Sequence, residues 1–216
     1  MINSKFNSIC DYSSFIFILG GAFQGKSILS IKTAERYTFS TVLSTDCFRN
    51  FLRINNPTEA ILCSTSKLDV NIFNKQREEI SDLLFNILKF YADRKEKVII
   101  EGIHFSKDFL EFAIKNGAKC LCLNNKIPWK EKVSLKKITT PITRIIDKKT
   151  GKESYIEHTD NLNIDDISYT HKEKDYTNIH NIIISDANSL KICNIAFNNI
   201  NDAFLEICVN LDKYFL

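Results

Sequence analysis

Apolar and polar residues follow one another along this chain in blocks that predict strands and helices in alternation. The apolar run Phe15–Leu19 is typical of a buried strand, and a helix is expected from Lys26 to about Arg36. Thr38–Ser44 is rich in β-branched and aromatic residues and predicts a second strand. A short helix is expected at Cys47–Ile54, which carries two arginines four residues apart.

The middle of the chain continues this alternation. Lys75–Arg94 is the clearest helix, because its apolar residues recur at intervals of three and four positions. A third apolar strand follows at Lys97–Gly102. Ser106 is expected to cap a helix that ends near Asn116, and Lys119–Leu123 predicts a fourth strand.

The last part of the chain predicts a fifth strand at Ile182–Ser185 and a closing helix at Leu190–Tyr214, with a break expected near Asn198–Asn201. Strands that alternate with helices indicate a three-layer α/β/α fold, in which helices cover both faces of a five-stranded, mostly parallel sheet. The 216 residues are expected to form one domain, residues 1–216, in which the segment from about 126 to 180 is interpreted as a lid insertion.

Composition narrows the class of protein. The seven cysteines are scattered, without a C-x-x-C pair, and are expected to be reduced thiols, mostly in the core of a cytoplasmic protein. No segment approaches the roughly 18 apolar residues that a membrane helix needs, so no membrane association is expected. The net charge of +3 is too small to argue for nucleic-acid binding by itself.

The charges are unevenly distributed in the predicted lid. Residues 126 to 152 hold nine basic side chains and two acidic ones, a local balance of +7, and the next segment, to residue 175, is acidic. Such blocks are usually solvated surface or a mobile segment. A lid that closes over an anionic ligand needs a basic residue to stabilise its charge as an arginine finger does, and the candidates are Lys136, Lys137 and above all Arg144.

The strongest motif follows the first strand. Residues 20 to 27, GGAFQGKS, fit the phosphate-loop pattern G-x-x-x-x-G-K-[ST] without a mismatch. Backbone N–H groups of such a loop converge on phosphate oxygens, Lys26 would reach the β- and γ-phosphates, and the Ser27 hydroxyl would bind Mg²⁺. The predicted nucleotide-binding residues are Gly20, Gly21, Ala22, Phe23, Gln24, Gly25, Lys26, Ser27 and Ile28. The alternative is a glycine-rich turn before an ordinary helix.

Two acidic residues stand where the second and third strands end. In an open parallel sheet, ligands bind beyond the carboxyl ends of the strands, so both acids are expected beside the phosphate loop. Asp46 is predicted to accept the proton of an acceptor hydroxyl or to hold Mg²⁺ through water, although it could instead cap the following helix. Glu101 is expected near Mg²⁺ or the acceptor, because a carboxylate at the end of a buried strand needs a partner.

Three basic or titratable residues are candidates for binding the acceptor. Arg49, one helical turn after Asp46, could pair with an anionic acceptor or with the phosphoryl group in transfer, because guanidinium matches phosphate geometry. Arg53 is a weaker candidate on the same face. His104 could bind the acceptor, although a lone histidine is more often structural. Solvated surface is the alternative for both arginines.

The motifs together point to a known family. The phosphate loop, the S-T-D-x-x-R segment from Ser44 to Arg49 and the E-G-x-H segment from Glu101 to His104 occur in this order. In this the chain resembles the 2-phosphoglycerate kinase family of small P-loop kinases, over roughly residues 15 to 125. The resemblance implies the P-loop nucleoside triphosphate hydrolase fold, ATP with Mg²⁺ as the donor and a small hydroxyl compound as the acceptor. Polynucleotide kinases and zeta-toxin-like kinases share the Asp-x-x-Arg arrangement.

The leading hypothesis is an ATP-dependent kinase that phosphorylates a hydroxyl of a small, anionic, 2-phosphoglycerate-like acceptor. The predicted catalytic residues are Lys26, Asp46, Arg49 and Arg144. A polynucleotide, nucleoside or sugar-nucleotide kinase is the first alternative, with nucleic acid possible but not favoured as a partner. A nucleotide-dependent switch or ATPase without an acceptor is the second. The identity of the acceptor and the oligomeric state stay open.

Overall fold

The computed structural model describes residues 11–55, 69–129, 131–132, 142–146, 153–157 and 166–216. It divides into two compact units, one made of Met1–Lys126 with Asp175–Leu216 and the other of Ile127–Lys174. The first unit holds the sheet and every site residue predicted from the sequence except the lid candidates Lys136, Lys137 and Arg144.

The first unit is built on a five-stranded sheet in which every strand pair is parallel. In spatial order the strands are β2 (Thr41–Ser44), β3 (Val98–Gly102), β1 (Phe15–Leu19), β4 (Lys119–Asn125) and β7 (Cys193–Phe197). The central strand β1 pairs with β3 on one side and β4 on the other. The predicted α/β fold with a five-stranded parallel sheet is therefore confirmed.

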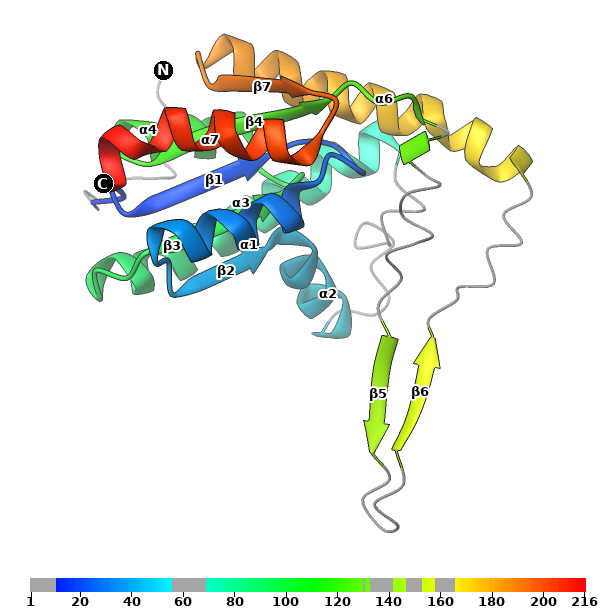
Figure 1. Ribbon diagram of the computed structural model, residues 1–216, viewed down its shortest axis with the longest axis horizontal. Coiled ribbons are helices and arrows are strands. Elements are labelled where there is room, and N and C mark those ends of the chain that lie inside the picture. Colours follow the sequence, from blue (N-terminus) through cyan, green and yellow to red (C-terminus); the bar gives the residue numbers. More distant parts are fainter. Residues whose placement is uncertain (1–10, 56–68, 130, 133–141, 147–152, 158–165) are drawn as a thin grey trace. The chain divides into compact units, whose positions relative to one another are not determined.

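Helices cover both faces of this sheet (Figure 1). On one face α1 (Lys26–Tyr37) and α7 (Ile200–Phe215) pack over a core that includes Ile16 and Ile18. The other face carries α3 (Val70–Asp93), α4 (Lys107–Lys115) and the part of α6 (Asp166–Ser189) that belongs to this unit, over a core that includes Phe15 and Phe17. The helix α2 (Thr45–Asn55) follows β2 directly.

Strand β1 is the anchor of the fold, because all five of its side chains are at most 2% exposed. Successive residues of a strand point to opposite faces, so a fully apolar strand fills both cores at once. Burying a side chain such as Phe17 or Ile18 stabilises the fold by roughly 1.5–3 kcal/mol. The loop that leaves the end of β1 therefore starts from a fixed point.

The predicted fifth strand is wrong. Ile182–Ser185 lies inside α6, where Ile179, Ile183 and Ala187 are buried at intervals of four residues. That spacing places the three side chains on one face of a helix, and it outweighs the β-branched composition of the segment. A run of three isoleucines reads equally well as a strand when only its composition is considered.

The actual fifth strand, β7, occupies the start of the predicted closing helix. Ile195 and Phe197 are buried on either side of the exposed Ala196, which is the alternation of a strand. The closing helix begins only at Ile200, where the Asn199 side chain accepts a hydrogen bond from the backbone N–H of Asn201 at 2.7 Å. The break expected near residues 198–201 is thus the boundary between β7 and α7.

Smaller corrections concern where elements begin. Thr38 has a left-handed backbone, with φ of 55°, and ends α1, so β2 starts only at Thr41. Thr45 and Asp46 form the first turn of α2 rather than the end of β2. Helix α3 starts at Val70, earlier than expected, because the Asp69 carboxylate accepts a hydrogen bond from the N–H of Ile72 at 2.8 Å.

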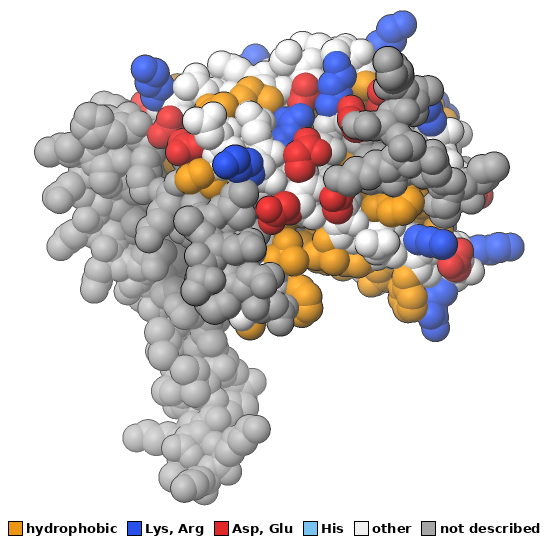
Figure 2. Space-filling model, turned by 180° about the vertical axis from the view of Figure 1, so that it is seen from behind, with side chains coloured by type: hydrophobic (Ala, Val, Ile, Leu, Met, Phe, Trp, Pro, Cys, Tyr) orange, Lys and Arg blue, Asp and Glu red, His pale blue; other side chains and the backbone are white. Residues whose placement is uncertain are grey.

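The second unit contains an antiparallel hairpin of β5 (Ile142–Ile146) and β6 (Glu153–Glu157), in which Arg144 is paired with Tyr155. The side chain of Arg144 lies outside the described part of the chain, as do Lys136 and Lys137. On the face shown in Figure 2, lysines and arginines are interspersed with acidic side chains over the described surface. Among the described helices, none is long and apolar enough to cross a membrane.

Candidate active site

The phosphate loop joins β1 to α1 through a tight turn. Phe23 and Gly25 have left-handed backbones, with φ of 60° and 76°, which let the chain reverse between the buried strand and the helix. No side chain caps the N-terminus of α1, which starts at Lys26. The positive end of the helix dipole and the first N–H groups of α1 therefore face the position of an anion.

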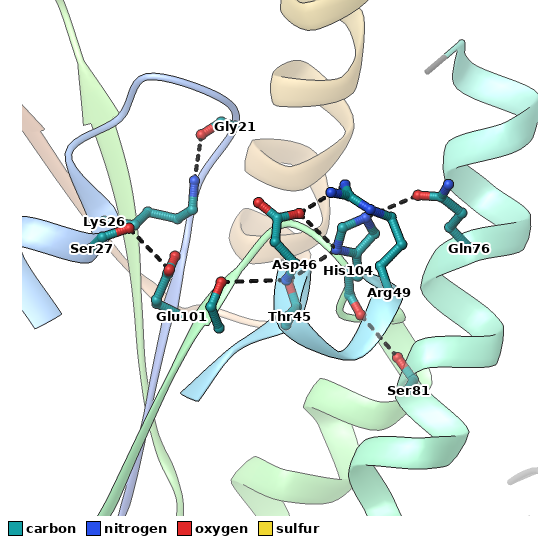
Figure 3. A network of polar contacts seen from close by, with 11 residues as sticks. Gly21, Lys26, Ser27, Thr45, Asp46, Arg49, Gln76, Ser81, Glu101 and His104 are labelled. Atoms are coloured by element: carbon teal, nitrogen blue, oxygen red, sulfur yellow. Dashed lines mark hydrogen bonds and ion pairs between the residues drawn. The ribbon is translucent and has the colours of Figure 1, made fainter. Parts of the chain in front are cut away.

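Two side chains of the loop fix its shape. Gln24 is buried, and its Oε1 accepts a hydrogen bond from the backbone N–H of Asn125, at the end of β4, at 2.5 Å. The Lys26 ammonium donates to the carbonyl oxygen of Gly21 at 2.7 Å. The lysine thus bridges its own loop (Figure 3).

Helix α6 also packs on the phosphate loop. The N–H of Gly21 donates to Nδ1 of His180 at 3.2 Å, and the other ring nitrogen lies 3.4 Å from Oδ1 of Asn124. The rings of Phe23 and Tyr176 meet edge to face, with centroids 6.1 Å apart. These α6 residues were not predicted from the sequence, because the isoleucines that follow them indicated a strand. A helical reading of the segment would have put Tyr176 and His180 on the buried side, with Ile183.

Ser27 and Glu101 are in direct contact. The serine hydroxyl donates to Glu101 Oε1 at 3.0 Å, and the glutamate is only 6% exposed at the end of β3. Strand β3 lies beside β1, so the third strand end and the phosphate loop meet as expected. A hydroxyl and a carboxylate are the oxygen ligands that Mg²⁺ prefers together with substrate phosphates, so this pair fits a magnesium ion. Among the described residues, no group of three or more His, Cys, Asp and Glu could hold a metal alone.

Asp46 and Arg49 form an ion pair on the first turn of α2. Arg49 Nη1 lies 2.8 Å from Asp46 Oδ1, with the arginine side chain 6% exposed and the aspartate side chain 54% exposed. The buried guanidinium thus holds an accessible carboxylate in one orientation. The charge pair lies on the side of the site away from Ser27 and Glu101 (Figure 3).

His104 lies beneath this ion pair and is fully buried. Its Nδ1 is 2.9 Å from Thr45 Oγ1, and its Nε2 is 3.0 Å from Gln76 Oε1. Burial lowers the pKa of His104 to about 3, against the charge of Asp46 and with the help of Arg49 and Lys26. The ring is therefore neutral, and because an amide oxygen only accepts, the ring proton is on Nε2.

The segment around His104 is fixed to the sheet and to α3. The Ser81 hydroxyl accepts from the N–H of Ser106 at 2.8 Å and donates to the carbonyl oxygen of His104 at 3.4 Å. A Cβ atom on Gly102 would lie only 1.8 Å from Thr45 Oγ1. The glycine of the E-G-x-H segment therefore makes room for the threonine that starts α2.

The structure places most of the predicted site residues in the phosphate loop or in three sets of polar contacts, which are Lys26 with Gly21, Ser27 with Glu101, and Asp46 with Arg49 and His104 (Figure 3). Three predicted residues lie outside the loop and these contacts. Arg53 is exposed further along α2, and Ile28 is 48% exposed on α1. Arg144 belongs to the other unit. Thr45 and Gln76, which the sequence analysis did not single out, are the two direct partners of His104.

No protein-family model matches this chain. An uncharacterised protein of Dictyostelium discoideum is 28% identical over 145 residues, which are 57% of this chain. The matched region covers only 17% of that protein, so the relative is far longer than the part that it shares.

Two solved structures of shikimate kinases resemble this chain. Shikimate kinase from Acinetobacter baumannii, solved in complex with shikimate, superimposes with a TM-score of 0.53 and 12% identity, over 96% of both chains. Shikimate kinase from Bacteroides thetaiotaomicron matches with a TM-score of 0.45 and 17% identity, over 92% of this chain and 98% of its own. At 12% identity, the similarity to the Acinetobacter baumannii enzyme concerns the fold alone. With a phosphate loop after the central strand and the order β2-β3-β1-β4-β7, the chain has the P-loop nucleoside triphosphate hydrolase fold of small kinases such as shikimate kinase.

Proposed function

We propose that this protein is an ATP-dependent kinase that transfers the γ-phosphoryl group to a hydroxyl of a small anionic acceptor. The observation that carries the proposal is the accessible carboxylate of Asp46, held by the buried Arg49 beside a phosphate loop. A bare nucleotide-binding site needs the loop alone. A kinase also needs a group that orients the acceptor hydroxyl, and Asp46 is suited to that task.

On the donor side, residues 20 to 28 bind the triphosphate of ATP. The ammonium of Lys26 leaves the carbonyl of Gly21 and contacts the β- and γ-phosphates, which neutralises charge that develops during transfer. Ser27 and Glu101 would hold Mg²⁺, and the ion would supply positive charge against the phosphates. The 3.0 Å contact between the two side chains supports their sharing this role.

On the acceptor side, Asp46 accepts the proton of the hydroxyl that attacks, and Arg49 steadies the carboxylate and the phosphoryl group in transfer. The alternative role for Asp46 is to hold Mg²⁺ through water, and Arg53 is proposed to contribute to acceptor binding. We assign His104 a different part. With both ring nitrogens engaged by Thr45 and Gln76, it positions the start of α2 instead of contacting the acceptor.

The acceptor class rests on two resemblances. The sequence motifs resemble those of 2-phosphoglycerate kinases, and the fold is that of a kinase whose solved structure contains shikimate. Both compounds are small, carry a hydroxyl group and are anionic. We propose a carboxylated or phosphorylated hydroxy acid of this size. The lid role of residues 126 to 180, with Arg144 contacting the phosphates, remains a prediction.

A transfer assay tests the proposal. The protein with Mg²⁺ and ATP is offered 2-phosphoglycerate, shikimate, a nucleoside, a sugar nucleotide and an oligonucleotide, and products are identified by mass spectrometry. We expect a phosphorylated product from a small hydroxy acid. Transfer to the oligonucleotide alone, weakened by salt, would support a polynucleotide kinase instead. Phosphate release that no acceptor accelerates would support an ATPase.

Two variants assign the roles. Asp46→Asn should lower the transfer rate by about 10²–10⁴-fold and leave ATP affinity unchanged, because the amide cannot accept the proton. Asp202→Asn is the matched control, since Asp202 is exposed in the first turn of α7 and should behave as wild type. Glu101→Gln should raise the Mg²⁺ concentration needed for activity. Full turnover by Asp46→Asn would refute the assignment of the base.

A further inference from the structure

A second concave site lies at the edge of the sheet opposite the phosphate loop. The cavity has a volume of about 320 Å³ and is lined by the first residues of two strands, Lys119 of β4 and Cys193 of β7. Because all five strands are parallel, their amino ends form one edge and the phosphate loop lies beyond the other. The volume falls at the lower end of the range for small-molecule sites, roughly 300–1,000 Å³.

Three lysines line this cavity, and no acidic residue does. They are Lys119, Lys191 and Lys213, which come from β4, from the turn before β7 and from the end of α7. Within the described part of the chain, none of the three makes an ion pair with a carboxylate. Asp212, next to Lys213 in the chain, is held by Arg36 at 3.2 Å, and Glu206 acts on the Cys193 thiol without an ion pair to any of the three lysines. The cavity therefore concentrates positive charge.

Two of these lysines share one aromatic ring. The ammonium of Lys119 lies 3.8 Å from the ring centroid of Tyr214, and that of Lys213 lies 5.0 Å from the same centroid. The two charges therefore lie within about 9 Å of each other, a distance comparable to the Debye length at physiological salt. Like charges at this separation repel, and a bound anion would relieve the repulsion.

The thiols at this site do not balance that charge. Burial raises the pKa of Cys120 and of Cys193, so both thiols are protonated at neutral pH. Apolar side chains, among them Ile114, Leu121 and Leu190, supply the rest of the wall. A ligand for this site thus needs a negative group for the lysines and a flat apolar part for the wall and the tyrosine ring.

We propose that this cavity is a second anion-binding site, separate from the phosphate loop, that takes a small phosphate monoester carrying an aromatic or heterocyclic ring. The phosphate lies among Lys119, Lys191 and Lys213. The ring packs on Tyr214 and the apolar wall. The proposal does not depend on the kinase activity, because none of these residues belongs to the candidate active site.

Binding of 1-naphthyl phosphate, measured by isothermal titration calorimetry, tests the proposal. We expect saturable binding to the wild-type protein, weakened at least about tenfold in Lys119→Gln/Lys213→Gln, because charge-assisted contacts to phosphate are lost. Lys89→Gln/Lys107→Gln is the matched control, since both lysines are exposed on α3 and α4 and the change in net charge is equal. Lys26→Ala should bind the probe as wild type does.

Each other outcome overturns the proposal. The proposal would be refuted if the double variant bound the probe as tightly as the wild-type protein, or if the wild-type protein showed no saturable binding. Loss of binding in Lys26→Ala would place the probe in the phosphate loop. Inorganic phosphate that binds as tightly as the probe would refute the aromatic class of ligand. If the double variant fails to fold by circular dichroism, Tyr214→Leu replaces it, since this ring is 50% exposed and its loss should weaken binding about threefold or more.

Discussion

Protonation of His104 should destabilise the folded protein in mild acid. Burial lowers the pKa of His104 to about 3 in the folded state, against an ordinary histidine pKa of 6.5 in an unfolded chain. Between these two values the unfolded state binds more protons than the folded state, so the free energy of unfolding falls as pH falls. Above the pKa of the unfolded state, the neutral ring contributes its full stabilisation. This contribution is lost as the pH falls toward the pKa of the folded state.

The size of the effect follows from the same two values. Each pH unit below 6.5 removes about 1.4 kcal/mol, so lowering the pH to 5 should cost about 2 kcal/mol from this one group. That is a large fraction of the roughly 5–15 kcal/mol by which such a domain is stable. Protonation also places a proton on Nδ1, which then cannot accept from Thr45, the first residue of α2.

Urea unfolding at pH 7 and pH 5, compared between wild type and His104→Asn, measures this contribution. The variant should be less stable at pH 7 by roughly 1–3 kcal/mol, because Thr45 and Gln76 lose hydrogen-bond partners. Its loss between pH 7 and pH 5 should be smaller than that of wild type by about 2 kcal/mol, while the other histidines contribute equally to both proteins. Equal losses would mean that His104 titrates normally in the folded state, and would refute the reasoning.

Three further predictions concern tight contacts of the site. Gly102→Ala places a Cβ atom 1.8 Å from Thr45 Oγ1 and should destabilise the fold by roughly 2–5 kcal/mol in urea unfolding. Gly21→Ala brings a Cβ atom to 2.9 Å from that of His180 and should weaken ATP binding, and a second change, His180→Ala, should restore part of it. Gln24→Ala leaves the buried N–H at the end of β4 without its acceptor and should cost about 1–3 kcal/mol, with unchanged stability refuting its anchoring role.

Much of the fold could be predicted because its central elements are governed by local patterns. Strand β1 is a continuous apolar run, and the phosphate loop follows it, so the sequence marks both the strand and the turn. The same holds for the Ser106 cap, whose hydroxyl accepts from the N–H of Phe109 at 3.3 Å. The general rule for parallel sheets then placed Glu101 beside Ser27 without any information on contacts.

The wrong assignment of strand and helix in the last third of the chain has a physical cause. The isoleucines of α6 and the short strand β7 both read as buried apolar runs, and only their length and period distinguish them. Packing decided between them, because α6 buries Ile179 and Ile183 on one face while β7 completes the sheet beside β4. As a consequence the contact between His180 and the phosphate loop could not be predicted, since it depends on that helix lying against Gly21.

The difference between buried and exposed positions explains why the acceptor is harder to predict from the sequence than the proposed phosphoryl transfer. The donor side is held by buried groups, Gln24 and Glu101, whose partners are a backbone amide and a loop residue, and such contacts leave a motif in the sequence. The proposed acceptor side starts from α2, where Arg49 is buried against His104 of the segment after β3. The face of α2 that carries Asp46 is accessible, because the side chain of Asp46 is 54% exposed. An exposed face can change its side chains without disturbing the buried network beneath it. Proteins that share this buried network can therefore differ in acceptor, and under the proposed function exchanging exposed residues of α2 should alter acceptor preference before it alters ATP binding.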